Sequence, residues 1–174
     1  MTTFYFIRHG KDDFTEANTK IYQGWGFNMR PLSPVGIDQI KNASKDERLQ
    51  DADLIITSPY GRTMHTAAIL SKELQIDMVV ETDLHEWCAD KNYEYLSDEE
   101  ACKNYEELHT FNGSYPDDEE RDWESAELIK KRIGNVLEKY KQYKKVIVVC
   151  HGTVMQYFLD IPHPNNGEIF EYVD

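Results

Sequence analysis

The sequence predicts an α/β fold of three layers, in which helices cover both faces of a mostly parallel central sheet. Short apolar strands alternate with amphipathic helices along the chain, which is the pattern of this fold class. With 174 residues, 40% of them hydrophobic, the chain is long enough for one domain with its own core. The apolar runs at residues 4–7 and 146–150 each lead into a His-Gly pair. We therefore expect one domain over residues 1–174, organised around two strand ends.

The N-terminal half is expected to contain two strand-helix units. The aromatic and β-branched run at residues 4–7 predicts a buried strand, and residues 11–32 show no sustained period, so we expect a long surface loop there. Ser33-Pro34 supplies an N-cap and a first-turn proline, which predict the start of a helix. A second strand is expected at residues 54–56, and the helix after it carries Arg62 in its first turn.

The C-terminal half is expected to contain three strands and two helices around a polar insertion. The insertion, residues 87–124, has 13 acidic residues against three basic ones, and we expect it to be partly helical and to cover the sheet edge as a lid. Apolar residues at helical spacing predict an amphipathic helix from Ala126, after a cap at Glu124-Ser125. The other expected elements are strands at 78–80, 146–150 and 169–173 and a short helix at 155–159.

Composition excludes several function classes. The net charge of −13 and the pI near 4.8 argue against a nucleic-acid partner, because phosphate backbones are bound through clustered Lys and Arg. Three cysteines without a Cys-x-x-Cys pair favour a reduced, cytoplasmic setting. We see neither a basic leader nor an apolar stretch that could span a membrane, so no membrane partner is expected. The sequence carries no signal of oligomeric state.

Cationic side chains follow the strand ends. Because the carboxyl ends of parallel strands meet at one sheet edge, we expect Arg8, His9, Arg62 and His151 to lie close together. Arginine offers paired hydrogen bonds to phosphate oxygens, and a histidine whose pKa is lowered by nearby cations is a neutral nucleophile. A covalent histidine intermediate divides a slow hydrolysis into two steps, and a carboxylic acid such as Glu86 can protonate the leaving group. The pattern predicts a phosphoryl-transfer site.

The remaining histidines and cysteines have other expected roles. No His-x-His or His-x-x-x-His pair occurs among the six histidines, so no metal site is expected. Cys150 is expected to face the core because side chains alternate along a strand. His85 is a candidate lining residue of the site, whereas His109 and His163 are expected at the surface or in turns.

Seven short segments have an order and spacing typical of a known family. They are Ile7-Arg8-His9-Gly10, Gln23-Gly24-Trp25, Pro31-Leu32-Ser33 with Gly36 and Gln39, Thr57-Ser58-Pro59 with Arg62 and Thr66-Ala67, Leu84-x-Glu86, Glu124-Ser125 with Arg132, and Cys150-His151-Gly152. Together they resemble the histidine phosphatase superfamily, specifically its phosphoglycerate mutase-like branch. The resemblance covers nearly the whole chain.

The resemblance implies a role for each matching residue. His9 would become phosphorylated, a pocket of Arg8, Arg62 and His151 would bind the transferred group, and Glu86 would protonate the leaving group and then activate water. No metal or organic cofactor is implied. The implied substrate-binding residues are Thr15, Gln23, Gly24 and Thr153.

The chain also departs from the family pattern. Lys11 replaces the usual acidic residue after Arg-His-Gly, and Thr15 stands where mutases commonly carry a phosphate-binding asparagine. His65 occupies a position that often holds glutamine, and no glycine follows Glu86 at the usual distance. Four carboxylates near the third strand remain candidates for the proton donor, with Glu86 preferred: Glu81, Asp83, Glu86 and Asp90.

The acidic insertion helps to choose among three functions. Family mutases use basic lid residues to hold a second anionic group, and this insertion has no paired arginines. We therefore expect hydrolysis of one phosphate ester, from a small phosphorylated metabolite whose identity the sequence leaves open. The alternatives are a phosphoglycerate mutase and a phosphate-ligand binding module without turnover.

Overall fold

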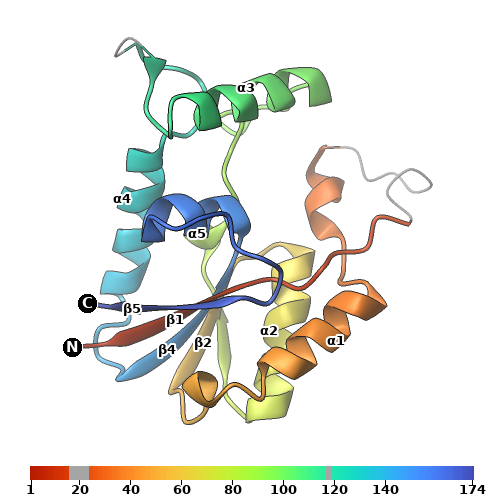
Figure 1. The fold of residues 1–174 in the computed structure, drawn as a ribbon, viewed down its shortest axis with the longest axis vertical. Helices are drawn as coiled ribbons and strands as arrows, with labels where there is room; N and C mark the ends of the chain where they lie inside the picture. Colours follow the sequence, from red (N-terminus) through yellow and green to blue (C-terminus); the bar gives the residue numbers. More distant parts are fainter. Residues whose placement is uncertain (16–23, 117–118) are drawn as a thin grey trace.

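A five-stranded sheet forms the middle layer of the protein in a computed structural model that describes residues 1–15, 24–116 and 119–174 (Figure 1). The strand order is β3-β2-β4-β1-β5. The strands are β1 (Thr3–Arg8), β2 (Leu54–Thr57), β3 (Met78–Val80), β4 (Lys145–Cys150) and β5 (Ile169–Val173). The first four run parallel, and β5 runs antiparallel to β1. The predicted α/β class with a mostly parallel sheet is confirmed.

Helices cover both faces of the sheet. The helices are α1 (Pro34–Ala43), α2 (Gly61–Leu74), α3 (Asp98–Thr110), α4 (Ala126–Glu138) and α5 (Gly152–Leu159). Alternation along β1 shows the two layers: Phe4 and Phe6 join a core with α4 and α5, whereas Tyr5 and Ile7 join one with α1 and α2. Each face of the sheet therefore has its own apolar core.

Local capping fixes two of the predicted helix starts. The Ser33 hydroxyl accepts a hydrogen bond from the Gly36 N–H, with Pro34 as the first helical residue of α1. Ser125 accepts from the Leu128 N–H at the start of α4. Such a cap contributes about 1 kcal/mol to stability. Both starts agree with the prediction because they depend on residues only three positions apart.

Two regions differ from the sequence pattern. The expected loop at residues 11–32 contains a 3-10 helix, η1 (Gly24–Met29), and its ends are joined by a β-bridge between Asp12 and Leu32. The acidic insertion, residues 87–124, contains α3 and fully buries Leu108 and Trp123 in the core of α4 and α5. A charged sequence with few apolar residues is therefore anchored by two of them.

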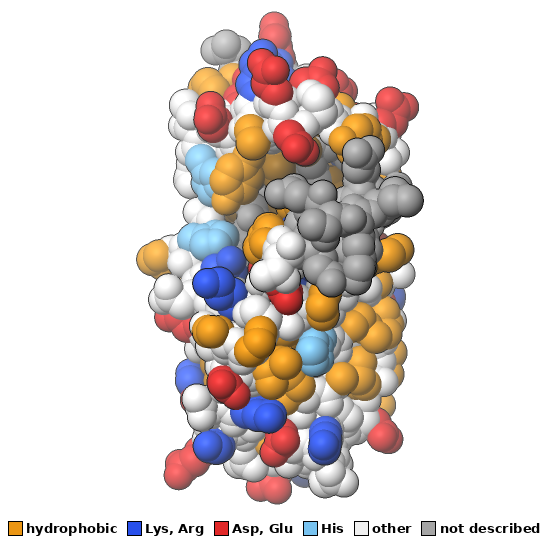
Figure 2. Space-filling model, turned by 90° about the vertical axis from the view of Figure 1, so that its right-hand side faces the viewer, with side chains coloured by type: hydrophobic (Ala, Val, Ile, Leu, Met, Phe, Trp, Pro, Cys, Tyr) orange, Lys and Arg blue, Asp and Glu red, His pale blue; other side chains and the backbone are white. Residues whose placement is uncertain are grey.

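The structure also bears on membrane association. In the described residues, no helix is both long and apolar enough to cross a membrane. Figure 2 shows acidic side chains at the upper end of the molecule, where α3 lies. This end is the charged surface that the composition of the insertion indicates.

Candidate active site

The two strand-end histidines lie beside each other. β1 and β4 are neighbours in the sheet, with Arg8 opposite Cys150 in the register, so His9 and His151 follow at the same level of the carboxyl edge. Their ring centroids are 5.4 Å apart, and both side chains are buried. The structure therefore brings together the two His-Gly pairs of separate strands.

The His9 ring is held in one orientation by two hydrogen bonds. Its Nδ1 lies 2.8 Å from the Gly10 carbonyl oxygen, which can only accept, so Nδ1 carries the proton. The Nε2 atom accepts from Nε–H of Arg62 at 3.2 Å. Burial, followed by the positive charge of Arg62, lowers the pKa of His9 to about 3. At neutral pH the ring is neutral, and its lone pair is on Nε2.

Arg62 lies in the first turn of α2 and links it to η1. Its Nη1 donates to Oδ1 of Asn28 at 3.3 Å. A Cβ atom at Gly61 would lie 2.2 Å from the Met29 carbonyl oxygen, so only glycine allows η1 to approach α2 this closely. Burial lowers the pKa of Arg62, and the Glu86 carboxylate opposes that shift. The Glu86 charge therefore acts on the guanidinium beside His9.

The His151 ring is bound on one side only. Its Nε2 lies 2.7 Å from the Ser58 hydroxyl, and the Tyr60 ring packs against it with centroids 5.1 Å apart. Its Nδ1 is buried and has no hydrogen-bond partner in the parts of the chain that the structure describes. Burial, then the Arg62 charge, lowers the pKa of His151 well below its usual value. This leaves a neutral imidazole with one polar atom available to a ligand.

Arg8 packs against the turn that contains Pro164 and against the start of α5. Its Nη1 donates to the Pro164 carbonyl at 2.6 Å, and its buried Nε has no partner within residues 1–15, 24–116 and 119–174. A Cβ at Gly152 would lie 3.2 Å from Cζ of Arg8 and 2.5 Å from Cε1 of His163. Arg8 and His163 therefore both pack over the start of α5. A buried donor without a hydrogen-bond partner lowers the stability of the fold unless a ligand accepts its hydrogen bond.

Glu86 is oriented toward the helix that follows His151. Its Oε1 accepts from the Val154 N–H at 3.3 Å, in the first turn of α5, and from the Trp87 N–H at 2.8 Å. Two of the other candidate carboxylates have different partners: Glu81 binds Tyr140 and Lys139, and Asp90 accepts from the Asn92 N–H. Of these carboxylates, Glu86 is the one bonded to the turn that also contains the buried Thr153.

The structure places the other expected site residues as follows. The Thr15 hydroxyl donates to Oδ1 of Asp13 at 2.7 Å on the exposed surface, and Gly24 begins η1. Gln23 lies outside the described residues. The side chain of His85 contacts the acidic insertion, where its Nε2 lies 3.1 Å from the Tyr93 hydroxyl.

Three residues near the site were missed by sequence reasoning. Asn166 donates from Nδ2 to the His9 carbonyl oxygen at 2.9 Å, the Pro164 carbonyl accepts from Arg8, and His163 packs on Gly152. Burial and the Arg8 charge lower the pKa of His163. The only available signal was the run of turn-forming residues between α5 and β5, which is typical of many surface turns.

Comparison with known proteins gives a consistent family. The sequence profile of the histidine phosphatase superfamily (branch 1) matches residues 4–163. A protein of Bacillus subtilis (strain 168), described as the uncharacterized phosphatase PhoE, is 27% identical over an alignment of 165 residues, and the match covers 91% of this chain and 76% of PhoE. The profile match includes both strand-end histidines, His9 and His151.

Solved structures show the same fold. Phosphoglycerate mutase from Bacillus anthracis (strain Sterne) has a TM-score of 0.70 at 21% identity and covers 98% of this chain and 86% of its own. Mycobacterial glucosyl-3-phosphoglycerate phosphatase in complex with VO3 has a TM-score of 0.68 at 17% identity, covering 98% and 90%. These structures share the sheet and helices described above. Together with the profile match over residues 4–163, they place the chain in the histidine phosphatase superfamily.

Proposed function

We propose that this protein is a phosphatase that hydrolyses a small phosphomonoester through a phosphohistidine intermediate on His9. The observation that carries the proposal is the state of the His9 ring, whose Nδ1 is held by Gly10 while Nε2 keeps its lone pair beside Arg62. A neutral imidazole among cations is a competent nucleophile for phosphorus. The family and the phosphatase name of the B. subtilis relative support hydrolase chemistry.

Three side chains around His9 are suited to hold the phosphoryl oxygens. Arg62 is already within hydrogen-bond distance of Nε2, so an oxygen on a phosphorus attached there would meet its guanidinium. Nε of Arg8 and Nδ1 of His151 are buried polar atoms that a bound phosphoryl group would complete. Donors placed before the reaction stabilise charge that develops during it.

The proposed reaction has two steps. First, Nε2 of His9 attacks phosphorus, the bond between phosphorus and the ester oxygen breaks, and Glu86 gives that oxygen a proton, so the alcohol leaves. Second, Glu86 takes a proton from water, the water oxygen attacks phosphorus, and the P–N bond breaks to release inorganic phosphate. Glu86 is the supported proton carrier because the Val154 N–H holds it at the turn that follows His151.

The charges of the acidic insertion support hydrolysis over transfer between phosphoglycerates. Its Lys91 pairs with Glu120, and its one arginine, Arg121, pairs with Glu119 and Glu107. These cations are already neutralised and are poor candidates for a second anionic group of a substrate. We therefore propose a substrate with one phosphate ester and an uncharged or cationic remainder.

A screen of phosphorylated metabolites with phosphate release as the readout tests the proposal. Wild-type protein should release phosphate from at least one small phosphomonoester and yield an acid-labile phosphoenzyme on quenching, and His9→Asn should show neither. His109→Asn is the matched control, because His109 lies on α3 and contacts the Tyr157 hydroxyl, not a side chain of the proposed phosphoryl pocket. Release by His9→Asn at the wild-type rate would refute the mechanism.

Two further measurements separate the alternatives. Isomerisation of 3-phosphoglycerate in a coupled assay, faster than phosphate release, would indicate a mutase. Inorganic phosphate binding without turnover on any substrate of the screen would indicate a binding module.

A further inference from the structure

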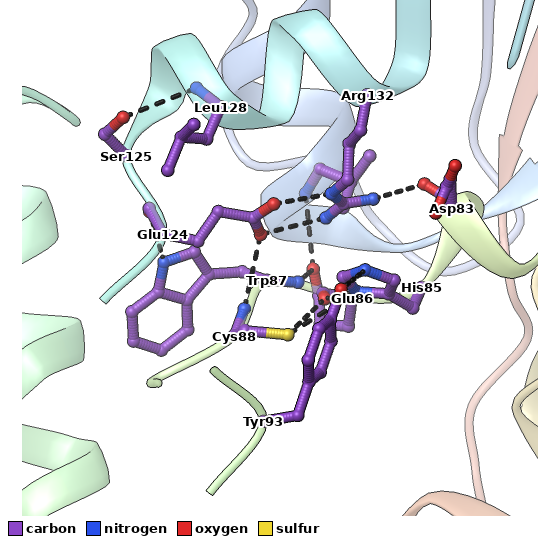
Figure 3. A network of polar contacts seen from close by, with 11 residues as sticks. Asp83, His85, Glu86, Trp87, Cys88, Tyr93, Glu124, Ser125, Leu128 and Arg132 are labelled. Atoms are coloured by element: carbon purple, nitrogen blue, oxygen red, sulfur yellow. Dashed lines mark hydrogen bonds and ion pairs between the residues drawn. The ribbon is translucent and has the colours of Figure 1, made fainter. Parts of the chain in front are cut away.

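A second cluster of polar side chains, which can ligate a metal ion, lies next to Glu86 in the sequence and at the end of the acidic insertion. An imidazole nitrogen of His85, the sulfur of Cys88 and a carboxylate oxygen of Glu124 all lie within 4.8 Å of one another. Figure 3 shows the three side chains converging from the segment after η3 (Thr82–Leu84) and from the start of α4. We propose that His85, Cys88 and Glu124 bind a divalent cation of the Zn²⁺ class.

The histidine and cysteine are spaced as two ligands of one ion. Sγ of Cys88 lies 3.5 Å from Nδ1 of His85. Zn–S and Zn–N bonds of about 2.3 and about 2.0 Å at a tetrahedral angle place the two ligand atoms about 3.5 Å apart. The distance between the two ligand atoms therefore suits one ion, and the His85 ring has to turn away from the Glu86 carbonyl to direct Nδ1 at it.

The surroundings of His85 can supply the partner that a ligating histidine needs. Nδ1 now donates to the Glu86 carbonyl at 2.6 Å, and Nε2 lies 3.1 Å from the Tyr93 hydroxyl. Binding through Nδ1 moves the ring proton to Nε2, from which the Tyr93 oxygen can accept it. The thiol proton of Cys88 is released to water, so the ligand is a thiolate. In metal sites, an acceptor bound to the ring nitrogen that does not ligate the ion fixes the orientation of the histidine ring.

Glu124 is held in place for the third ligand position. Its carboxylate forms a two-point ion pair with Nε and Nη2 of Arg132, the latter at 3.0 Å, and Oε2 also accepts from the Cys88 N–H at 3.4 Å. Each carboxylate oxygen has two lone pairs, so an ion can bind where the arginine does not. Ligating carboxylates are commonly hydrogen-bonded in this way. Arg132 would then orient the ligand.

The donor set and the charge select the type of ion. One thiolate, one imidazole and one carboxylate suit Zn²⁺ and related borderline cations better than Mg²⁺ or Ca²⁺, which take oxygen ligands. The thiolate and the Glu124 carboxylate supply two negative charges to the site, one of which is shared with the Arg132 guanidinium. A cavity of about 260 Å³ adjoins the cluster and provides an entry path and room for a water as fourth ligand. It is also lined by Lys91, which pairs with Glu120, and by Lys131 and Asn135.

An ion here would join the two ends of the acidic insertion. His85 and Cys88 flank its beginning and Glu124 is its last residue, and the two segments already exchange a backbone hydrogen bond from Glu124 N–H to the Cys88 carbonyl at 3.0 Å. Glu86 lies between two of the ligands. Binding would stabilise the base of the insertion beside the proposed proton carrier.

Titration of the metal-free protein with Co²⁺ tests the site, because a thiolate bound to Co²⁺ gives a charge-transfer absorption in the near ultraviolet. We expect one equivalent to produce this band, Zn²⁺ to remove it by displacement, and Cys88→Ser to abolish it. Cys102→Ser is the matched control, since Cys102 is exposed on α3 and should leave the band unchanged. The histidines of the phosphoryl pocket cannot produce the band, because the cysteine next to them in sequence, Cys150, is fully buried in the apolar core with α4 and α5.

Thermal unfolding gives an independent readout that does not depend on catalysis. Zn²⁺ at a hundredfold excess over its Kd should raise the Tm of the wild type and of Cys102→Ser by about 5 °C, and leave the Tm of Cys88→Ser unchanged. Absence of the cobalt band in wild-type protein, or its persistence in Cys88→Ser, would overturn the proposal. Neither result would bear on phosphohistidine formation at His9.

Discussion

The two strand-His-Gly segments have the same local sequence pattern and different surroundings. At the end of β1, Nε2 of His9 faces the Arg62 guanidinium and Nδ1 is bound to the next carbonyl group. At the end of β4, Nε2 of His151 is bound to the Ser58 hydroxyl, and Nδ1 has no partner among the described residues. The nitrogen not held by an oxygen is therefore Nε2 in His9, where Arg62 donates to the lone pair, and Nδ1 in His151.

We infer from this difference that the two rings have different roles in the proposed reaction. Because the pKa of His9 is lowered to about 3, its ring carries a single proton, which is on Nδ1 and bound to a carbonyl, so Nε2 has a lone pair suited to attack phosphorus. If the Ser58 hydroxyl donates to Nε2 of His151, the proton of that ring is on Nδ1, and its available atom is a donor for an oxygen. In the proposed mechanism, neighbouring strands thus supply a nucleophile and a charge stabiliser from the same motif.

Replacing each histidine in turn gives the largest expected effect. His9→Asn should lower kcat/KM by at least about 10³-fold and abolish the trapped phosphoenzyme, because it removes the attacking atom. His151→Asn should lower kcat by about 10²-fold and still yield phosphoenzyme, because it removes one stabilising donor. Rapid-quench measurement with a substrate from the screen compares them. Phosphoenzyme in His9→Asn and none in His151→Asn would reverse the two roles.

The two glycines after the histidines should differ in stability. A Cβ at Gly10 would lie 2.6 Å from the Gly36 carbonyl oxygen, a backbone atom that cannot move alone, whereas at Gly152 it would meet the exposed ring of His163. Gly10→Ala should therefore lower the free energy of unfolding by about 3 kcal/mol, and Gly152→Ala by under about 1 kcal/mol. Urea denaturation of both variants measures this. Equal losses would show that the His163 ring is as fixed as the backbone.

The parts of the site that were predictable from sequence depend on residues close in the chain. Arg8 and His9 end a strand, Ser125 caps a helix, and Arg62 begins one, and each of these features follows from a short pattern. Parallel pairing then places the strand ends at one edge. Local chemistry and one topological rule were sufficient for these residues.

The features that sequence reasoning missed depend on contacts between distant segments. Asn166 reaches the His9 carbonyl across 157 positions, and Pro164 reaches Arg8 across 156. Trp123 lies in an acidic stretch and is nevertheless buried against α4 and α5. The side chains of His85 and Cys88 lie beside Glu124 because the two ends of the acidic insertion lie next to each other in the fold. Composition and periodicity do not predict contacts between segments that are distant in the sequence.

The pH dependence of stability tests whether both rings are neutral in the folded protein. The pKa of His9 is about 3 in the folded chain and near 6.5 when unfolded, so only the unfolded state binds its proton at intermediate pH. Stability from this group is complete above pH 6.5 and is lost as pH falls toward 3. From pH 6.5 to 5 the wild type should lose about 1.5 kcal/mol more than His9→Asn.

The same comparison applies to His151, whose pKa is lowered in the same direction. His151→Asn should reduce the acid loss in a similar way, because burial lowers the pKa of His151 as it lowers that of His9. Urea denaturation at pH 6.5 and 5 gives the free energies. Identical losses of stability in the wild type and His9→Asn would mean that the pKa of His9 in the folded chain is near its ordinary value.

The smallest expected effect concerns the hydroxyl that orients His151. Ser58→Ala removes the 2.7 Å contact to Nε2, so the ring proton is no longer confined to Nδ1, where a phosphoryl oxygen would need it. One such hydrogen bond is worth about 1 kcal/mol, so kcat/KM should fall about fivefold while phosphoenzyme still forms. Ser71→Ala, which removes a similar contact to the Ile76 carbonyl at the far end of α2, should leave kcat/KM unchanged. If Ser58→Ala also leaves kcat/KM unchanged, the bound phosphoryl group itself fixes the tautomer of His151. The two rings would then differ only in that Arg62 contacts His9.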